Sequence, residues 1–223
     1  MNQPLAHLGQ ILRPDDGTAA AHSRSALLGL AAVLVVCGLA YGAVMGTFGG
    51  VGVDRLEQIA YSAVKVPVLL GVTFAICLPS FFVLNTLLGV RNDFASVLRA
   101  LVAAQAGLAL ILASLAPYTA LWYLSFEHYQ IAIFFNGVMF AIASIMAQLI
   151  VRRLYRPLIN RDPRHRTLIR IWLAMYIAVG IQTAWVLRPF VGHPNLPTEF
   201  FREDSWTNAY VAIAHMIWQI LGE

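Results

Sequence analysis

Arginine side chains offer the clearest chemistry in this sequence, because seven of them fall within nineteen residues beside a single acid, Asp162. A guanidinium group binds phosphate through two parallel N–H donors. Seven guanidinium groups so close in the sequence could therefore bind the phosphates of a nucleic acid or of a membrane surface. The seven residues are Arg152, Arg153, Arg156, Arg161, Arg164, Arg166 and Arg170.

Neutral amides are the second group of side chains that could serve a function. Asn85, Gln105 and Asn136 each lie inside a long apolar run, and no Asp or Glu lies at the centre of such a run. Proton-coupled transport, voltage sensing and aspartyl proteolysis within a membrane all need ionisable groups there. The amides therefore favour either hydrogen bonds between helices or the lining of a polar path for a small solute, near the helix-breaking Pro79.

Motifs for enzymatic chemistry are absent from the sequence. It contains no HExxH, GxSxG, Walker or CxxC motif, and these are the signatures of zinc, serine-hydrolase, nucleotide and redox sites. We therefore predict a protein that is not an enzyme and that carries no cofactor or metal.

The elements that carry these residues are predicted from composition. Apolar residues make up 59% of the 223 residues and charged residues 12%, against roughly 25% charged in a soluble domain. About 20 apolar residues cross a bilayer as a helix. We predict an all-α, polytopic transmembrane bundle over 25–221, preceded by a cytoplasmic tail, 1–24, that could hold an interfacial helix. The predicted spans are 25–46, 66–88, 96–117, 130–151, 169–187 and a shorter sixth at 206–221.

Basic residues on alternate connections predict the orientation. One side collects 11 of the 15 lysines and arginines and the other side collects 4, and cytoplasmic loops carry such an excess. The N-terminus and the arginine-rich connection are therefore predicted to be cytoplasmic. The arginine-rich, lysine-poor composition favours a bacterial cytoplasmic membrane, and the net charge of +4 reflects topology rather than a nucleic-acid partner.

Two connections show local helix signals. Asp54 and Glu57 have the spacing of a capping box, which predicts an amphipathic interfacial helix that ends before Pro67 opens the second span. Pro157 and Pro163 are predicted to prevent one continuous helix through the arginine-rich connection.

Glycines recur every four residues in and after the first span, at Gly38, Gly42, Gly46 and Gly50. Such a stripe lets a second helix approach backbone to backbone. The partner is either another copy of the chain or another span of the same chain.

The stretch from Lys65-Val66-Pro67 through Leu78-Pro79-Ser80 to Leu84-Asn85, followed by an alanine-rich helix, resembles bacterial members of the Yip-domain (Ypt-interacting protein) superfamily. The resemblance covers spans one to five and implies a non-enzymatic membrane protein with an organising or adaptor role. The cytosolic Asp-Leu-Tyr-Gly-Pro and Gly-Tyr motifs of eukaryotic members are absent from residues 1–24. No GTPase-contact residue is therefore carried over.

The sequence thus predicts a non-enzymatic integral membrane protein that organises the membrane, acts as an adaptor or forms a subunit of a membrane complex. The alternative is a small-solute transporter or channel subunit that uses Asn85, Gln105 and Asn136. The predicted partners are the lipid bilayer, a second copy or another membrane subunit, and anionic lipids. The candidate headgroup ligands are Arg152, Arg153, Arg156, Arg161, Arg164 and Arg166.

Overall fold

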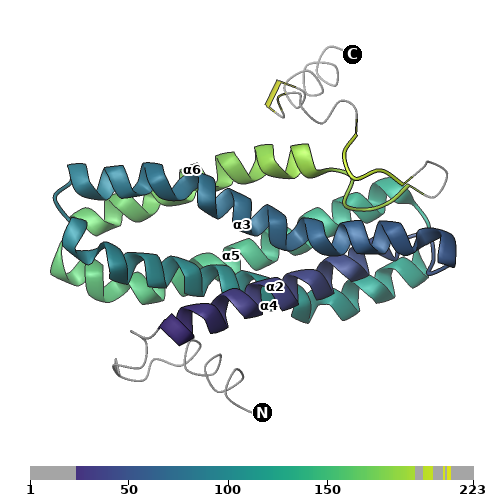
Figure 1. Ribbon diagram of the computed structural model, residues 1–223, viewed down its shortest axis with the longest axis horizontal. Helices are drawn as coiled ribbons and strands as arrows, with labels where there is room; N and C mark the ends of the chain where they lie inside the picture. The colour runs from purple at the N-terminus through teal and green to yellow at the C-terminus, as the bar shows by residue number, and fades with distance from the viewer. Residues whose placement is uncertain (1–23, 194–197, 203–207, 209, 212–223) are drawn as a thin grey trace.

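The computed structural model describes residues 24–193, 198–202, 208 and 210–211 (Figure 1). In this part of the chain, every long element is a helix, and two single-turn 3-10 helices, η2 and η3, precede the second and third of them. The elements are α2 (Arg24–Gly46), η2 (Val53–Arg55), α3 (Leu56–Leu87), η3 (Arg91–Asp93), α4 (Phe94–Ser125), α5 (Tyr129–Arg161) and α6 (Arg164–Leu187).

All five α-helices are long and apolar enough to cross a membrane. The prediction of an all-α fold with five spans is therefore confirmed for the described residues. The predicted sixth span at 206–221 and most of the tail at 1–24 lie outside the described residues.

The helices run up and down in an elongated bundle (Figure 1), and α4 is the most deeply buried of them. Helix α2 packs against α3 and α4, α5 packs against α4, and α6 packs mainly against α3. Every residue of 103–109 in α4 is buried. Alanine and glycine supply five of these seven residues, and such small side chains let neighbouring helices approach closely on all sides.

Helix α3 differs from the sequence prediction. It is one continuous helix of 32 residues that contains both Pro67 and Pro79. The residue at its N-cap is Arg55 and not Asp54, so the predicted cap position is wrong. Because the helix is continuous, the prediction of a separate interfacial helix before Pro67 is also wrong. A helix satisfies its backbone hydrogen bonds internally in a membrane, where neighbouring helices also support the groups that a proline leaves unpaired.

The arginine-rich connection also differs from the prediction in its shape. Pro157 lies inside α5, which continues to Arg161, and the break comes at Asp162 and Pro163. The arginines therefore lie on the ends of two long helices joined by a tight turn. We call this end of the bundle the arginine end.

Two glycines of α2 lie directly against the backbone of α3. A Cβ placed on Gly42 would lie 2.8 Å from the Cα of Ala63, and one placed on Gly46 would lie 2.6 Å from the Cα of Ile59. Real Cβ atoms do not come so close to a backbone. The two helices can hold their present separation only because both positions are glycine.

The other two glycines of the stripe differ from each other. Gly38 faces α3 as well, where a Cβ would lie 3.2 Å from the ring of Pro67. Gly50 lies beyond the end of α2, has a φ of +115°, and no atom lies within 4 Å of the position that a Cβ would occupy. The part of the stripe inside the helix is thus covered by a span of the same chain.

Candidate membrane-surface site

The turn between α5 and α6 places the arginines at one end of the bundle. Asp162 has an extended backbone, and its Oδ1 accepts a hydrogen bond of 2.9 Å from the backbone N–H of Arg164. This bond satisfies one of the free N–H groups at the start of α6. The guanidinium of Arg164 in turn donates to the carbonyl of Leu88, at 2.9 Å, where α3 ends. A cation at the C-terminus of a helix is favourable.

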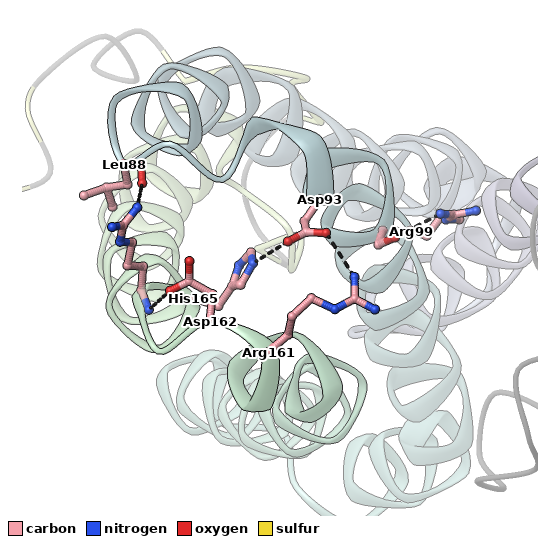
Figure 2. Close-up of polar contacts among 8 residues, drawn as sticks. Leu88, Asp93, Arg99, Arg161, Asp162 and His165 are labelled. Carbon is pink, nitrogen blue, oxygen red and sulfur yellow. Dashed lines mark hydrogen bonds and ion pairs between the residues drawn. The ribbon is translucent and has the colours of Figure 1, made fainter.

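Asp93 joins three helices at the same end (Figure 2). It directly precedes α4. One carboxylate oxygen lies 3.4 Å from Nη1 of Arg161, the last residue of α5. The other lies 3.1 Å from Nε2 of His165, in the first turn of α6. Asp93 therefore fixes the ends of α4, α5 and α6 relative to one another.

His165 is fully buried behind this ion pair. Its ring lies edge-on to Tyr155 of α5, with centroids 6.0 Å apart. His165 Nδ1 and the Tyr155 hydroxyl are both buried without a hydrogen-bond partner. The structure gives no chemical use for these two atoms.

All seven arginines of residues 152–170 have exposed side chains. Arg152 and Arg156 are one turn apart on α5, and Arg166 and Arg170 are one turn apart on α6. Arg161 is 75% exposed despite its contact with Asp93. The arginine end therefore has a wide, exposed, positively charged surface.

The opposite end of the bundle is closed by residues 188–193, which we call the strap. Four consecutive strap carbonyls each accept a hydrogen bond from a different side chain, so the strap is held along its whole length. The pairs are Lys65 Nζ with Pro189 (2.6 Å), Ser62 Oγ with Phe190 (2.5 Å), Tyr129 Oη with Val191 (3.3 Å) and Arg55 Nη2 with Gly192 (3.4 Å).

Basic residues at the strap end are placed differently from those at the arginine end. Lys65 is fully buried, and its ammonium lies 4.9 Å from the centre of the Phe200 ring. Arg55, Arg188 and Arg202 are each half-buried. The exposed positive charge is thus concentrated at one end of the bundle, because carbonyls and aromatic rings surround the cations at the other end.

The three amides are not brought together by the fold. Asn136 Oδ1 accepts a hydrogen bond of 3.2 Å from the Tyr41 hydroxyl, and its Nδ2 donates to the Tyr123 hydroxyl. Gln105 Oε1 accepts a bond of 2.9 Å from Tyr176 of α6. Asn85 donates to the carbonyl of Phe81 in its own helix, and its Oδ1 is buried without a partner.

Sequence reasoning missed Asp93 and His165. Both lie in connections that the charge count had already placed on one side of the membrane, the second-to-third and the fourth-to-fifth. That count included only lysine and arginine, so it did not consider Asp93 or His165, which are predicted to lie on the same side. Pairing the acids and histidines of each side would have suggested their contact.

Comparison of the chain with protein-family models, with curated proteins and with solved structures gives no match. The class of protein therefore follows from the molecule itself. Five apolar helices of membrane-spanning length, with exposed arginines gathered at one end, define an integral membrane protein.

Proposed function

We propose that the protein is a non-enzymatic membrane component, an organising protein or a subunit of a membrane complex, that binds anionic lipid headgroups at its arginine end. The observation that carries this proposal is the exposure of all seven arginines of residues 152–170. Each basic residue near an anionic leaflet contributes about 1 kcal/mol to its attraction, and the effect fades beyond a Debye length.

The arrangement of the arginines supports phosphate as the group that is bound. They extend from two adjacent helix ends, so several guanidiniums can reach one headgroup region at once. Arg161 and Arg164 are held in place by Asp93 and Leu88, which reduces the side-chain entropy lost on binding. The resemblance to Yip-domain proteins implies the same kind of organising role.

Removing three exposed arginines is expected to weaken lipid binding without disturbing the fold. The triple variant Arg152→Gln, Arg156→Gln, Arg166→Gln keeps Arg161 and Arg164, which form structural contacts. If the contributions add, the affinity for phosphatidylglycerol falls roughly a hundredfold at low salt. Native mass spectrometry of the purified protein with phosphatidylglycerol and phosphatidylcholine, at low and high salt, measures this loss.

The matched control carries lysine at the same three positions. It keeps the charge and removes the two-pronged guanidinium geometry, so we expect its affinity to lie between those of the wild type and the glutamine variant. Equal retention of phosphatidylglycerol by wild type and glutamine variant would show that Arg152, Arg156 and Arg166 do not bind the headgroup, and would refute the proposal that the exposed arginines act together as a lipid site.

We also propose that the N-terminus and the arginine end face the cytoplasm, in the cytoplasmic membrane of a bacterium. A reporter fused after Arg161 is then expected to be active as a cytoplasmic reporter, and one fused after His193 as an external reporter. Alkaline phosphatase and a fluorescent protein, which are active on opposite sides, measure both sites. Phosphatase activity at Arg161 would reverse the assignment.

A further inference from the structure

The turn between α3 and α4 is followed by an exposed arginine that lies outside residues 152–170. Gly89 of this turn has a φ of +76°, and Arg91 begins η3 two residues later. The turn is at the arginine end, because Nη1 of Arg164 lies 2.9 Å from the carbonyl of Leu88 (Figure 2). Arg91 is exposed, so it adds a positive charge to this end beside α3.

The guanidinium of Arg91 lies over an aromatic ring. Its central carbon is 5.9 Å from the centre of the Phe82 ring, and the negative face of such a ring attracts a cation. The Phe82 ring in turn lies edge-on to Phe94 of α4, with centroids 4.9 Å apart. The two aromatic side chains therefore hold the guanidinium near the end of α3.

Arg91 keeps its charge and its side-chain donors available. Within the part of the chain that the structure describes, its side chain forms no ion pair and no hydrogen bond. Asp93 is only two residues away, but one of its oxygens pairs with Arg161 and the other with His165 (Figure 2). An exposed guanidinium presents its donors in a fork that matches phosphate. Arg91 thus has the charge and the donors that bind a phosphate group.

Apolar side chains cover the exposed face of α3 that leads away from this arginine. They recur at helical spacing and are between 41% and 76% exposed, at Val72, Ile76, Val83 and Leu87. The 15 residues from the first to the last rise ~22 Å as a helix. One leaflet provides about half of the ~30 Å hydrocarbon core of a bilayer. The apolar face is therefore long enough to cross the depth of one leaflet.

We propose that the α3–α4 turn binds one anionic phospholipid, with the phosphate on Arg91 and the acyl chains along the exposed face of α3. This site rests on the proposed function, because that function places the arginine end at lipid headgroups. The site uses a different arginine and a different pair of helices from those of residues 152–170, so each of the two sites is tested by its own variants.

The apolar face favours a lipid over a soluble phosphate compound as the ligand. A soluble phosphate would contact the guanidinium alone, whereas a phospholipid contacts the guanidinium and α3 together. The lipid that covers the face carries its own phosphate to the level of Arg91, and this raises the effective concentration of phosphate there.

Arg99, further along α4, provides a matched control. Its Nε donates to the carbonyl of Ala95 and its Nη2 to Oγ of Ser96, both at 3.1 Å. The guanidinium of Arg99 thus bonds within its own helix. Arg91→Gln and Arg99→Gln remove the same charge near the same end of the bundle, but only Arg91→Gln removes the proposed phosphate ligand.

Photolabelling of the full chain in phosphatidylcholine vesicles tests the site. The vesicles contain a small amount of phosphatidylglycerol or phosphatidylcholine with a photoactivatable acyl chain, and mass spectrometry identifies the labelled residues. We expect the phosphatidylglycerol probe to label residues 72–87 more than the phosphatidylcholine probe does. Arg91→Gln is expected to reduce that labelling about fivefold, the effect of one basic residue near an anionic headgroup, and Arg99→Gln is expected to change it little.

The same experiment separates this site from the proposed function. Labelling of residues 152–170 by the phosphatidylglycerol probe reports on the arginines of α5 and α6, and labelling of residues 72–87 reports on Arg91. The triple variant Arg152→Gln, Arg156→Gln, Arg166→Gln is expected to reduce the first and to leave the second. Circular dichroism confirms that each variant is folded.

Three results would overturn the site. Equal labelling of residues 72–87 by the two probes would show that α3 is covered by lipid without a preference for an anionic headgroup. An equal loss in both single variants would show that the net charge of this end, and not Arg91, attracts the lipid. Loss of the preference on addition of inorganic phosphate, but not of sodium chloride at the same ionic strength, would assign Arg91 to a soluble phosphate compound.

Discussion

Replacing Gly42 by leucine is expected to destabilise the bundle by about 3 kcal/mol or more, which exceeds the usual cost of an overpacked core position. The side chain would have to enter the backbone of α3, where a Cβ alone would lie 2.8 Å from the Cα of Ala63 and 2.9 Å from its carbonyl oxygen. Backbone atoms cannot move aside as a flexible side chain can, so α2 and α3 must separate. Reversible unfolding in mixed detergent micelles, followed by circular dichroism, measures the loss.

The matched control is Gly29→Leu on the same helix. Gly29 is exposed and has no atom within 4 Å of its Cβ position, so the substitution adds only surface that lipid or detergent can cover. We expect a change within about 0.5 kcal/mol. If both variants were equally stable, the close contact between α2 and α3 would be wrong.

Replacing Asn136 by leucine is expected to cost about 2 kcal/mol. Asn136 of α5 connects Tyr41 of α2 with Tyr123 of α4, so its loss removes a polar connection among three helices. Tyr41 is fully buried, and a buried O–H donor that has lost its acceptor costs roughly 1–3 kcal/mol. Hydrogen bonds between membrane helices contribute about 0.6 kcal/mol each on average. We therefore expect the loss of stability in the Asn136→Leu variant to be moderate. The same unfolding assay measures it.

Two further variants test whether the cost comes from the hydrogen bonds that Asn136 makes between helices. Adding Tyr41→Phe to the Asn136→Leu variant is expected to restore part of the stability, since it removes the hydroxyl that lost its acceptor. Asn85→Leu is expected to cost much less, because Asn85 bonds only within its own helix and its Oδ1 has no partner. A larger loss at Asn85 than at Asn136 would contradict this account.

The spans were predictable because the membrane imposes a length on apolar runs. The predicted positions of two helix ends were wrong. The second span was predicted over 66–88 and is part of a helix that begins at Leu56. The fourth was predicted over 130–151 and continues to Arg161 through Pro157. The rule that an internal proline ends a helix comes from soluble proteins. In these long helices the remaining hydrogen bonds and the neighbouring helices keep the helix intact.

The glycine spacing likewise identified a surface of close approach, although spacing alone left its partner open. Gly42 and Gly46 face Ala63 and Ile59 of the next helix. A stripe of glycines has the same appearance in the sequence whether the neighbour belongs to the same chain or to another. Only the packing of α2 beside α3 decided between them.

The sequence by itself determined the class of protein, the five apolar helices and the gathering of arginines at one end of the bundle, because these depend on the run length and charge of contiguous residues. The tertiary structure alone decided which polar side chains meet. Asp93 and His165 are 72 residues apart, and Lys65 reaches a carbonyl 124 residues away. Contacts over such separations depend on how whole helices are rotated and packed against one another. Short-range patterns in the sequence do not predict that rotation and packing.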